Sequence, residues 1–219
     1  MIKSELRSLI INLLPKYEEI LRFHPRVVDA AIEKALAEFY NLIFLRNPLE
    51  LERYTKGFGY TAAIPIALEA GTALRYANYP LMADGVTNVT TIAIPDKASG
   101  VRRISTIAQG GITFYPIDAR EMDLLGAGCY VNSITAKTGY CARRTRVEFY
   151  NATAAIIAAG CRMDLLIPFS KYEETDTVLV PELVSDEGMG FTDRVLKILE
   201  SVKPVELLEN KSLEENKNG

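Results

Sequence analysis

The chain has 219 residues, of which 48% are hydrophobic and 24% are charged, a globular composition that argues against wholesale disorder. Its 25 lysine and arginine residues are outnumbered by 28 aspartate and glutamate residues, so the formal net charge is −3. This charge disfavours a protein that holds nucleic acid by neutralising phosphates. The N-terminus lacks the pattern of a signal peptide and no apolar stretch is long enough to span a membrane, so we expect no membrane partner.

Residues 1–50 are predicted to be a helical region. Ser4 is a suitable cap for a first helix, and Pro15 interrupts the apolar periodicity that follows it. The clearest helix is predicted from Pro25 to about Leu45. One face of it carries four apolar residues, which we expect to be buried on the subunit's own β-rich body or on a neighbour's helix, and which are candidate subunit-interface residues: Val28, Ile32, Leu36 and Phe39.

Residues 51–182 are predicted to form a β-rich body. β-branched residues, glycine and proline become frequent there, and helical periodicity fades. The predicted strands are residues 72–79, 88–94, 101–107, 111–117, 130–136, 140–150, 162–167 and 177–180. Their spacing of about ten residues favours antiparallel sheets in a sandwich or open barrel. Hairpin turns are predicted at residues 109–111 and 137–139.

The C-terminal part is predicted to be a helix within residues 183–203, followed by a tail over residues 204–219. Gly188 and Gly190 weaken the start of the helix, so it is expected to begin as late as Thr192. The tail has a single apolar pair, Leu207 and Leu208, too little to order it alone. We therefore expect an extended tail that another chain fixes through these two candidate interface residues. The predicted fold class is α+β.

The sequence contains no specific catalytic constellation. It has a single histidine, His24, and its three cysteines are not spaced as metal ligands: Cys129, Cys141 and Cys161. The glycine pairs at 57 and 59 and at 126 and 128 do not continue as phosphate-binding loops. We therefore expect neither metal nor cofactor, and a protein that is not an enzyme.

Two acidic clusters are candidate sites for acid–base or divalent-metal chemistry. One comprises Asp118, Glu121 and Asp123, and the other Glu173, Glu174 and Asp176. Both fall in predicted loops or helix starts, where solvated acids are usual. A metal-assisted hydrolase that uses the first cluster is the weakest of the alternatives.

The sharpest local feature is a basic cluster within the predicted strand 140–150. It comprises Arg143, Arg144 and Arg146, and on a strand the last two share a face. Such a strand fits either a subunit interface, where acids of a neighbouring chain meet the guanidiniums, or contact with nucleic acid. The net charge favours the interface. Arg102 and Arg103 fit either role.

Three segments carry a resemblance in layout over about residues 1–200. They are the helix VVDAAIEKALAEFYN (27–41), the sheet run LRYANYPLM, VTTIAIPD, VRRI and FYPID (74–118), and MDLLIPF with DTVLVPE (163–182) before a terminal helix. In this order the chain resembles the head-to-tail connector, or adaptor, proteins of short-tailed bacteriophages, nearest to the ring proteins of crAss-like phages.

The resemblance implies a structural virion protein, made in the host cytoplasm and located at the head–tail junction. It implies a homo-oligomeric ring, commonly of twelve subunits, below the portal protein and beside other tail or ring proteins. DNA would pass through this ring without sequence-specific binding. The alternative is a β-sandwich module with helical attachments that binds a sugar or a peptide, for which the 8 phenylalanine and 11 tyrosine residues would suit a binding face.

Overall fold

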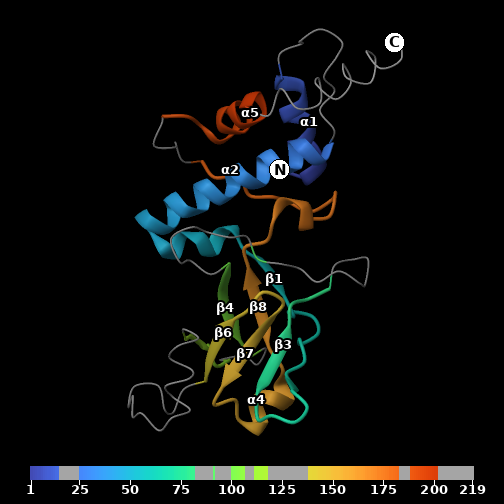
Figure 1. Cartoon of the computed structure of the whole chain (residues 1–219), viewed down its shortest axis with the longest axis vertical. Coiled ribbons are helices and arrows are strands. Elements are labelled where there is room, and N and C mark those ends of the chain that lie inside the picture. The colour runs from blue at the N-terminus through green and yellow to red at the C-terminus, as the bar shows by residue number, and fades with distance from the viewer. Residues whose placement is uncertain are drawn as a thin grey trace, which may run out of the picture. The chain divides into compact units, whose positions relative to one another are not determined.

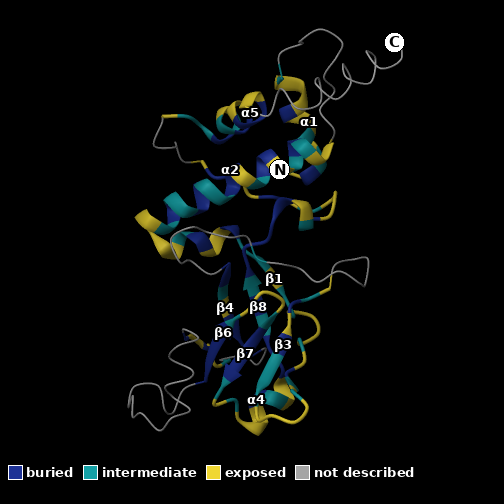
Figure 2. Cartoon of the chain, viewed as in Figure 1, coloured by how far each residue is buried: buried dark blue, intermediate teal, exposed yellow. Residues whose placement is uncertain are grey.

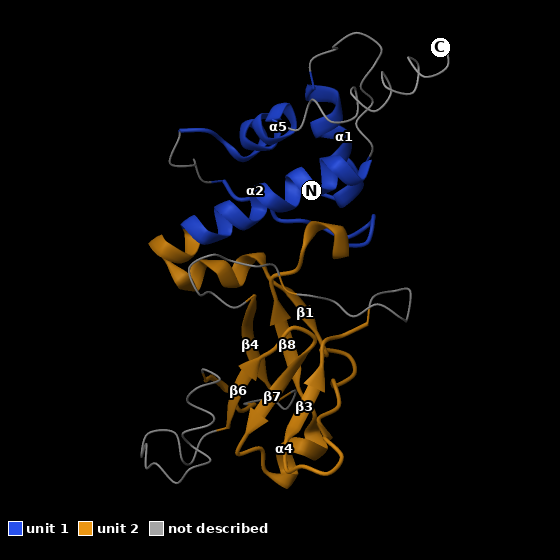
Figure 3. Ribbon diagram, in the orientation of Figure 1, with its two compact units in different colours: residues 1–42, 172–219 blue, residues 43–171 orange. Residues whose placement is uncertain are grey.

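The computed structural model describes residues 1–14, 25–81, 91, 100–106, 111–117, 138–182 and 188–201 (Figure 1). The fold is α+β, as predicted. The chain divides into two compact units (Figure 3): unit 1 is Met1–Leu42 with Tyr172–Gly219, and unit 2 is Ile43–Lys171. Residues 1–42 of the predicted helical region (1–50) and the predicted C-terminal helix therefore belong to unit 1, which also includes residues 172–182 of the predicted β-rich body, whereas residues 43–50 belong to unit 2.

Unit 1 contains three described helices: α1 (Lys3–Leu13), most of α2 (Pro25–Arg46) and α5 (Phe191–Ser201). The helix α5 contacts α1 and buries an apolar stripe of Phe191, Val195, Ile198 and Leu199. It begins at Phe191, close to the predicted start. Part of α2 is buried within the chain (Figure 2). The four apolar residues of α2 that are interface candidates are each 0% exposed within the single chain: Val28, Ile32, Leu36 and Phe39. They are core residues of the chain itself and have no surface to offer to a neighbour.

The first residues of the chain pair with a distant segment of unit 1. Ile2 forms an antiparallel bridge with Thr177, and the amide of Lys3 donates to the carbonyl of Asp176 over 2.9 Å. The predicted strand 177–180 is therefore present only as this bridge and lies outside the β-rich unit. Ser4 is not the helix cap, because α1 begins at Lys3 and the Glu5 carboxylate accepts a hydrogen bond from the amide of Ile2 at 3.1 Å.

Unit 2 contains two sheets, and among the described strands neither sheet closes into a barrel. The first is antiparallel, with the order β1 (Lys56–Phe58), β8 (Arg162–Leu165), β4 (Val101–Ser105). The second has the order β2 (Ala67–Leu68), β3 (Arg75–Asn78), β7 (Arg146–Tyr150), β6 (Gly139–Ala142), β5 (Tyr115–Pro116). Among the described strands, the β5–β6 pair alone is parallel, an exception to the predicted antiparallel pairing.

Phe114 connects the two sheets of unit 2. Its amide donates to the carbonyl of Ile104 in β4 over 2.9 Å, and its ring meets that of Phe149 in β7 edge to face with centroids 5.5 Å apart. Ile104 is fully buried and both aromatic rings are nearly so. The core of unit 2 thus includes side chains from both sheets. Residue pairing between Ser105 and Thr113 agrees with the predicted hairpin, and residues 107–110 between them lie outside the described residues.

The described residues of unit 2 also include the 3₁₀ turns η1 (Pro48–Tyr54) and η2 (Phe169–Lys171) and the short helix α4 (Ala154–Ala159). Thr153 caps α4, since its hydroxyl accepts a hydrogen bond from the amide of Ile156 at 3.4 Å. Gly160 ends α4 with a φ of 67°, a conformation that favours glycine. In the described part of the chain, no helix is long and apolar enough to cross a membrane.

Candidate functional site

The predicted strand 140–150 is two strands joined by a turn, which changes the geometry of the arginine cluster. The amide of Arg143 donates to the carbonyl of Arg146 over 2.8 Å and closes a hairpin between β6 and β7. Arg143 and Arg144 therefore lie in the turn, and only Arg146 is on a strand. The expectation that Arg144 and Arg146 share a strand face was wrong.

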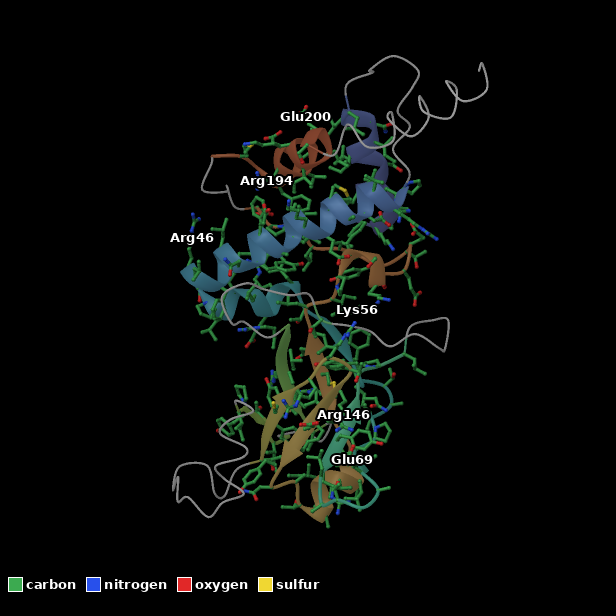
Figure 4. The ribbon with its side chains drawn as sticks, in the orientation of Figure 1. Arg46, Lys56, Glu69, Arg146, Arg194 and Glu200 are labelled. Atoms are coloured by element: carbon green, nitrogen blue, oxygen red, sulfur yellow. The ribbon has the colours of Figure 1, made fainter. Side chains whose placement is uncertain are left out.

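Acids of the same chain meet two of the three guanidiniums. Glu148 accepts a hydrogen bond from Nε of Arg143 at 2.8 Å and another from Arg146 Nη2 at 3.0 Å. Arg146, labelled with Glu69 in Figure 4, also donates from Nη1 to Glu69 over 2.8 Å. Its guanidinium lies 5.0 Å from the ring centroid of Tyr76. Two cations and two carboxylates thus neutralise one another on this face of the sheet.

Glu148 is the centre of this network and is only 7% exposed. Burial opposes its ionisation, but the hydrogen bonds from Arg143 and Arg146 outweigh burial and lower the pKa of Glu148 below its ordinary value. The hydroxyl of Tyr79 donates to the carbonyl of Arg143 over 2.9 Å and so fixes the turn from β3's side. Arg144 is exposed, and its guanidinium has no hydrogen-bond or ion-pair partner among the described residues.

A second cluster of charges lies on the more exposed face of the three-stranded sheet. Strand β8 alternates, with Met163 and Leu165 fully buried and Arg162 and Asp164 partly exposed. In the register, Arg103 of β4 is opposite Asp164, and Ser105 is opposite Arg162. The guanidinium of Arg162 donates from Nε to the hydroxyl of the buried Ser105 at 2.6 Å.

Tyr60 completes this cluster by folding back over β1. Gly57 is opposite Asp164 in the register, and a Cβ at Gly57 would lie only 2.6 Å from Cε2 of Tyr60. The ring therefore occupies the place of the missing side chain, and the left-handed Gly59 (φ 79°) allows the chain to turn. The Tyr60 hydroxyl donates to Asp164 over 2.7 Å, and the guanidinium of Arg162 lies 5.0 Å from the ring centroid.

We call Tyr60, Arg103, Arg162 and Asp164 the Tyr60 patch. Tyr60 is 51% exposed, and Arg103 is exposed with no hydrogen-bond or ion-pair partner in the described ranges. Two guanidiniums and one carboxylate give the patch a net charge of +1. In contrast to the network of Arg143, Arg146, Glu69 and Glu148, the patch therefore keeps N–H groups that can donate to a partner. Sequence reasoning missed Tyr60, Arg162 and Asp164. The alternation Arg-Met-Asp-Leu at 162–165 signals a half-buried strand, but the partners depend on the register.

The acidic loop 173–176 is bound only in part within unit 1. Glu174 accepts hydrogen bonds from Arg7 at 2.9 and 3.0 Å, and Arg7 also forms a bidentate pair with Asp29 at 2.7 and 2.8 Å. The hydrogen bond from Arg7 lowers the pKa of Glu174. Glu173 is exposed, and its side chain has no partner among the residues that the structure describes.

Several candidates lie outside the described residues: His24, Asp118, Glu121, Asp123, the glycines at 126 and 128, Cys129, Leu207 and Leu208.

Cys141 and Cys161 are buried thiols, and burial raises the pKa of Cys161 to about 12, so the Cys161 thiol is unreactive near neutral pH. Within the described ranges, no three His, Cys, Asp or Glu residues are grouped to hold a metal ion.

In comparisons with known proteins, no protein-family model and no curated protein matches the chain.

Proposed function

We propose that the chain is a structural virion protein, a subunit of a ring below the portal that joins the head of a bacteriophage to its tail and lets DNA pass. The layout of the sequence, which resembles that of connector proteins, is the origin of this proposal. The observation that carries it is an unequal distribution of charge between the two units.

Unit 1 contains 11 basic and 18 acidic residues, a net charge of −7. Unit 2 contains 14 basic and 10 acidic residues, a net charge of +4. A closed ring is built from heterologous contacts, in which one surface of each subunit meets a different surface of the next. Opposite charges favour contact between unlike units of successive copies and oppose contact between like units. The charge distribution therefore favours contact between unlike units, as in a ring. An antiparallel dimer also pairs unlike units, so the mass of the assembly distinguishes the two.

The overall charge fits a channel for DNA. Each copy contributes −3, so a ring of twelve copies is strongly negative. A negative assembly repels phosphates and limits adhesion of DNA in transit, which agrees with passage without sequence-specific binding. The remaining partners in this proposal are the portal protein and other tail or ring proteins, and the site of action is the head–tail junction of the virion.

The proposal is tested by the mass and shape of the assembled full-length chain. We expect light scattering at low salt to give a mass of many subunits, and electron micrographs to show closed rings. Because screening weakens attraction between opposite charges, the assembled fraction should fall between about 0.05 and 0.5 M salt. A monomer or dimer at every concentration and salt would contradict the proposal. A glycan or peptide array that retains such a monomer would support the ligand-binding alternative.

A further inference from the structure

We propose that the Tyr60 patch is the surface on which a second copy of this chain docks, through carboxylates of its unit 1. This inference rests on the proposed ring and assigns one side of its subunit contact. In the second copy, the residue that we expect to bind the Tyr60 patch is Glu173.

The patch is organised before any partner binds. The buried hydroxyl of Ser105 holds Nε of Arg162 at 2.6 Å, and the Tyr60 ring supports the guanidinium from one side. No other hydrogen bond or ion pair of Arg162 occurs in the described part of the chain, so its terminal N–H groups remain available. A guanidinium in a fixed orientation binds a carboxylate in a bidentate manner with little loss of side-chain entropy.

Tyr60 adds the contact area that a charge alone does not supply. The residue is 51% exposed, yet its ring is fixed by the hydrogen bond from its hydroxyl to Asp164 and by its packing over Gly57. Tyrosine and arginine are the residues that most often dominate the binding energy of protein interfaces. Arg103, exposed on the adjacent strand, gives the patch a second cation.

A protein carboxylate fits this patch better than a nucleic-acid backbone does. Asp164 lies within the patch and reduces its net charge to +1, which matches a single carboxylate between Arg103 and Arg162 but is too small for the row of phosphates along a nucleic-acid backbone. Unit 1, with a net charge of −7, is the acidic surface that every copy carries. Within it, Glu173 is exposed and unpaired among the described residues, in contrast to Glu174, which Arg7 holds.

The test uses Arg103→Glu in the full chain, with Arg53→Glu as the matched control. Both residues are exposed arginines of unit 2, and Arg53 is 75% exposed with only a 4.0 Å pair to Glu50. We expect Arg103→Glu to raise the concentration for half assembly about tenfold or more while the control assembles as the wild type does. Adding Glu173→Arg to Arg103→Glu restores the opposite-charge pair and should recover most of the assembly.

Each other outcome is decisive. Normal assembly of Arg103→Glu and of Tyr60→Ala overturns this inference and leaves the proposed ring intact, whereas a wild-type chain that never assembles overturns both. Failure of Glu173→Arg to restore assembly overturns Glu173 as the partner. If Arg103→Glu assembles normally but retains less DNA on a filter, nucleic acid occupies the patch and the inference is wrong. Circular dichroism and thermal unfolding show that each variant is folded before its assembly is compared.

Discussion

Phe39 of α2 and Phe191 of α5 meet edge to face in unit 1, with ring centroids 5.7 Å apart and 65° between the ring planes. Phe39 is completely buried, and Phe191 is 4% exposed. On the same helices, Arg194 donates to Glu38 over 2.7 Å. An apolar contact and a charged one therefore connect a helix near the start of the chain to one near its end, which explains why the two ends form one unit.

Replacing Phe39 with alanine should destabilise the chain by about 3–5 kcal/mol, because it removes a buried aromatic ring and leaves a cavity. Urea unfolding followed by circular dichroism measures this change. The control is Leu45→Ala on the same helix, where the side chain is 61% exposed and the expected change is about 0.5 kcal/mol or less. Equal effects of the two variants would mean that Phe39 is not part of the core.

Glu148→Gln should destabilise the chain at pH 7 by about 1–3 kcal/mol, since Arg143 and Arg146 lose the carboxylate that both contact. The pKa of Glu148 is lowered from its ordinary value of 4.5 in the folded state. The stabilisation is therefore present above that value and is lost as the pH falls through the lower, folded-state pKa. We expect the difference between wild type and Glu148→Gln in urea unfolding to shrink as the pH falls below 4.5. A difference that stays constant on acidification would contradict the hydrogen-bond network around Glu148.

Arg144 and Arg146 are adjacent in the predicted cluster but should behave differently. Arg144→Glu changes an exposed turn residue, so we expect normal unfolding of the monomer and weaker assembly. Arg146→Glu places a carboxylate against Glu69 and Glu148 and should lower the unfolding temperature of the monomer itself. Thermal unfolding and light scattering separate the two effects. Normal assembly of Arg144→Glu together with reduced DNA affinity would assign Arg144 to nucleic acid.

The helices and their buried faces could be predicted because their signals are local. The spacing of Val28, Ile32, Leu36 and Phe39 defines one face of α2, and all four are buried. Whether that face meets the same chain or another one depends on residues far away, such as Phe191, and spacing does not contain this information. The bridge between Ile2 and Thr177 is of the same kind, because no local pattern marks Thr177 as the partner of Ile2.

The Tyr60 patch depends on register and so could not be predicted. Gly57, Asp164 and Arg103 lie on three different strands, and they are neighbours only because Gly57 and Arg103 both pair with Asp164. A shift of one residue would move Asp164 to the other face. The prediction of one strand through the arginine cluster at 143–146 was wrong for a related reason. The polar run contains no glycine or proline to mark the turn, and the acids that neutralise the arginines come from positions 69 and 148.

Substitution of Gly57 tests whether the ring of Tyr60 packs over this glycine. In Gly57→Ala the new Cβ would lie 2.6 Å from the ring, so Tyr60 must swing away and lose its hydrogen bond to Asp164. Because the ring is half exposed and can move into solvent, we expect a loss of about 1 kcal/mol or less, below the usual cost of overpacking a core. Partial burial, together with the hydrogen bond to Asp164, raises the pKa of Tyr60 above its ordinary value of 10.0, and displacement should return it toward that value.

The measurement is an alkaline absorbance titration of Gly57→Ala and of the wild type, each compared with Tyr60→Phe so that the signal of Tyr60 is isolated by difference. The matched control is Gly59→Ala, where the φ of 79° and the carbonyl oxygen of Cys161 at 2.8 Å leave the backbone no room to adjust. That variant should lose about 1–3 kcal/mol of stability from backbone strain. If Gly57→Ala keeps the raised pKa of Tyr60, the ring does not rest on Gly57, because a methyl group there and the docked ring cannot occupy the same space.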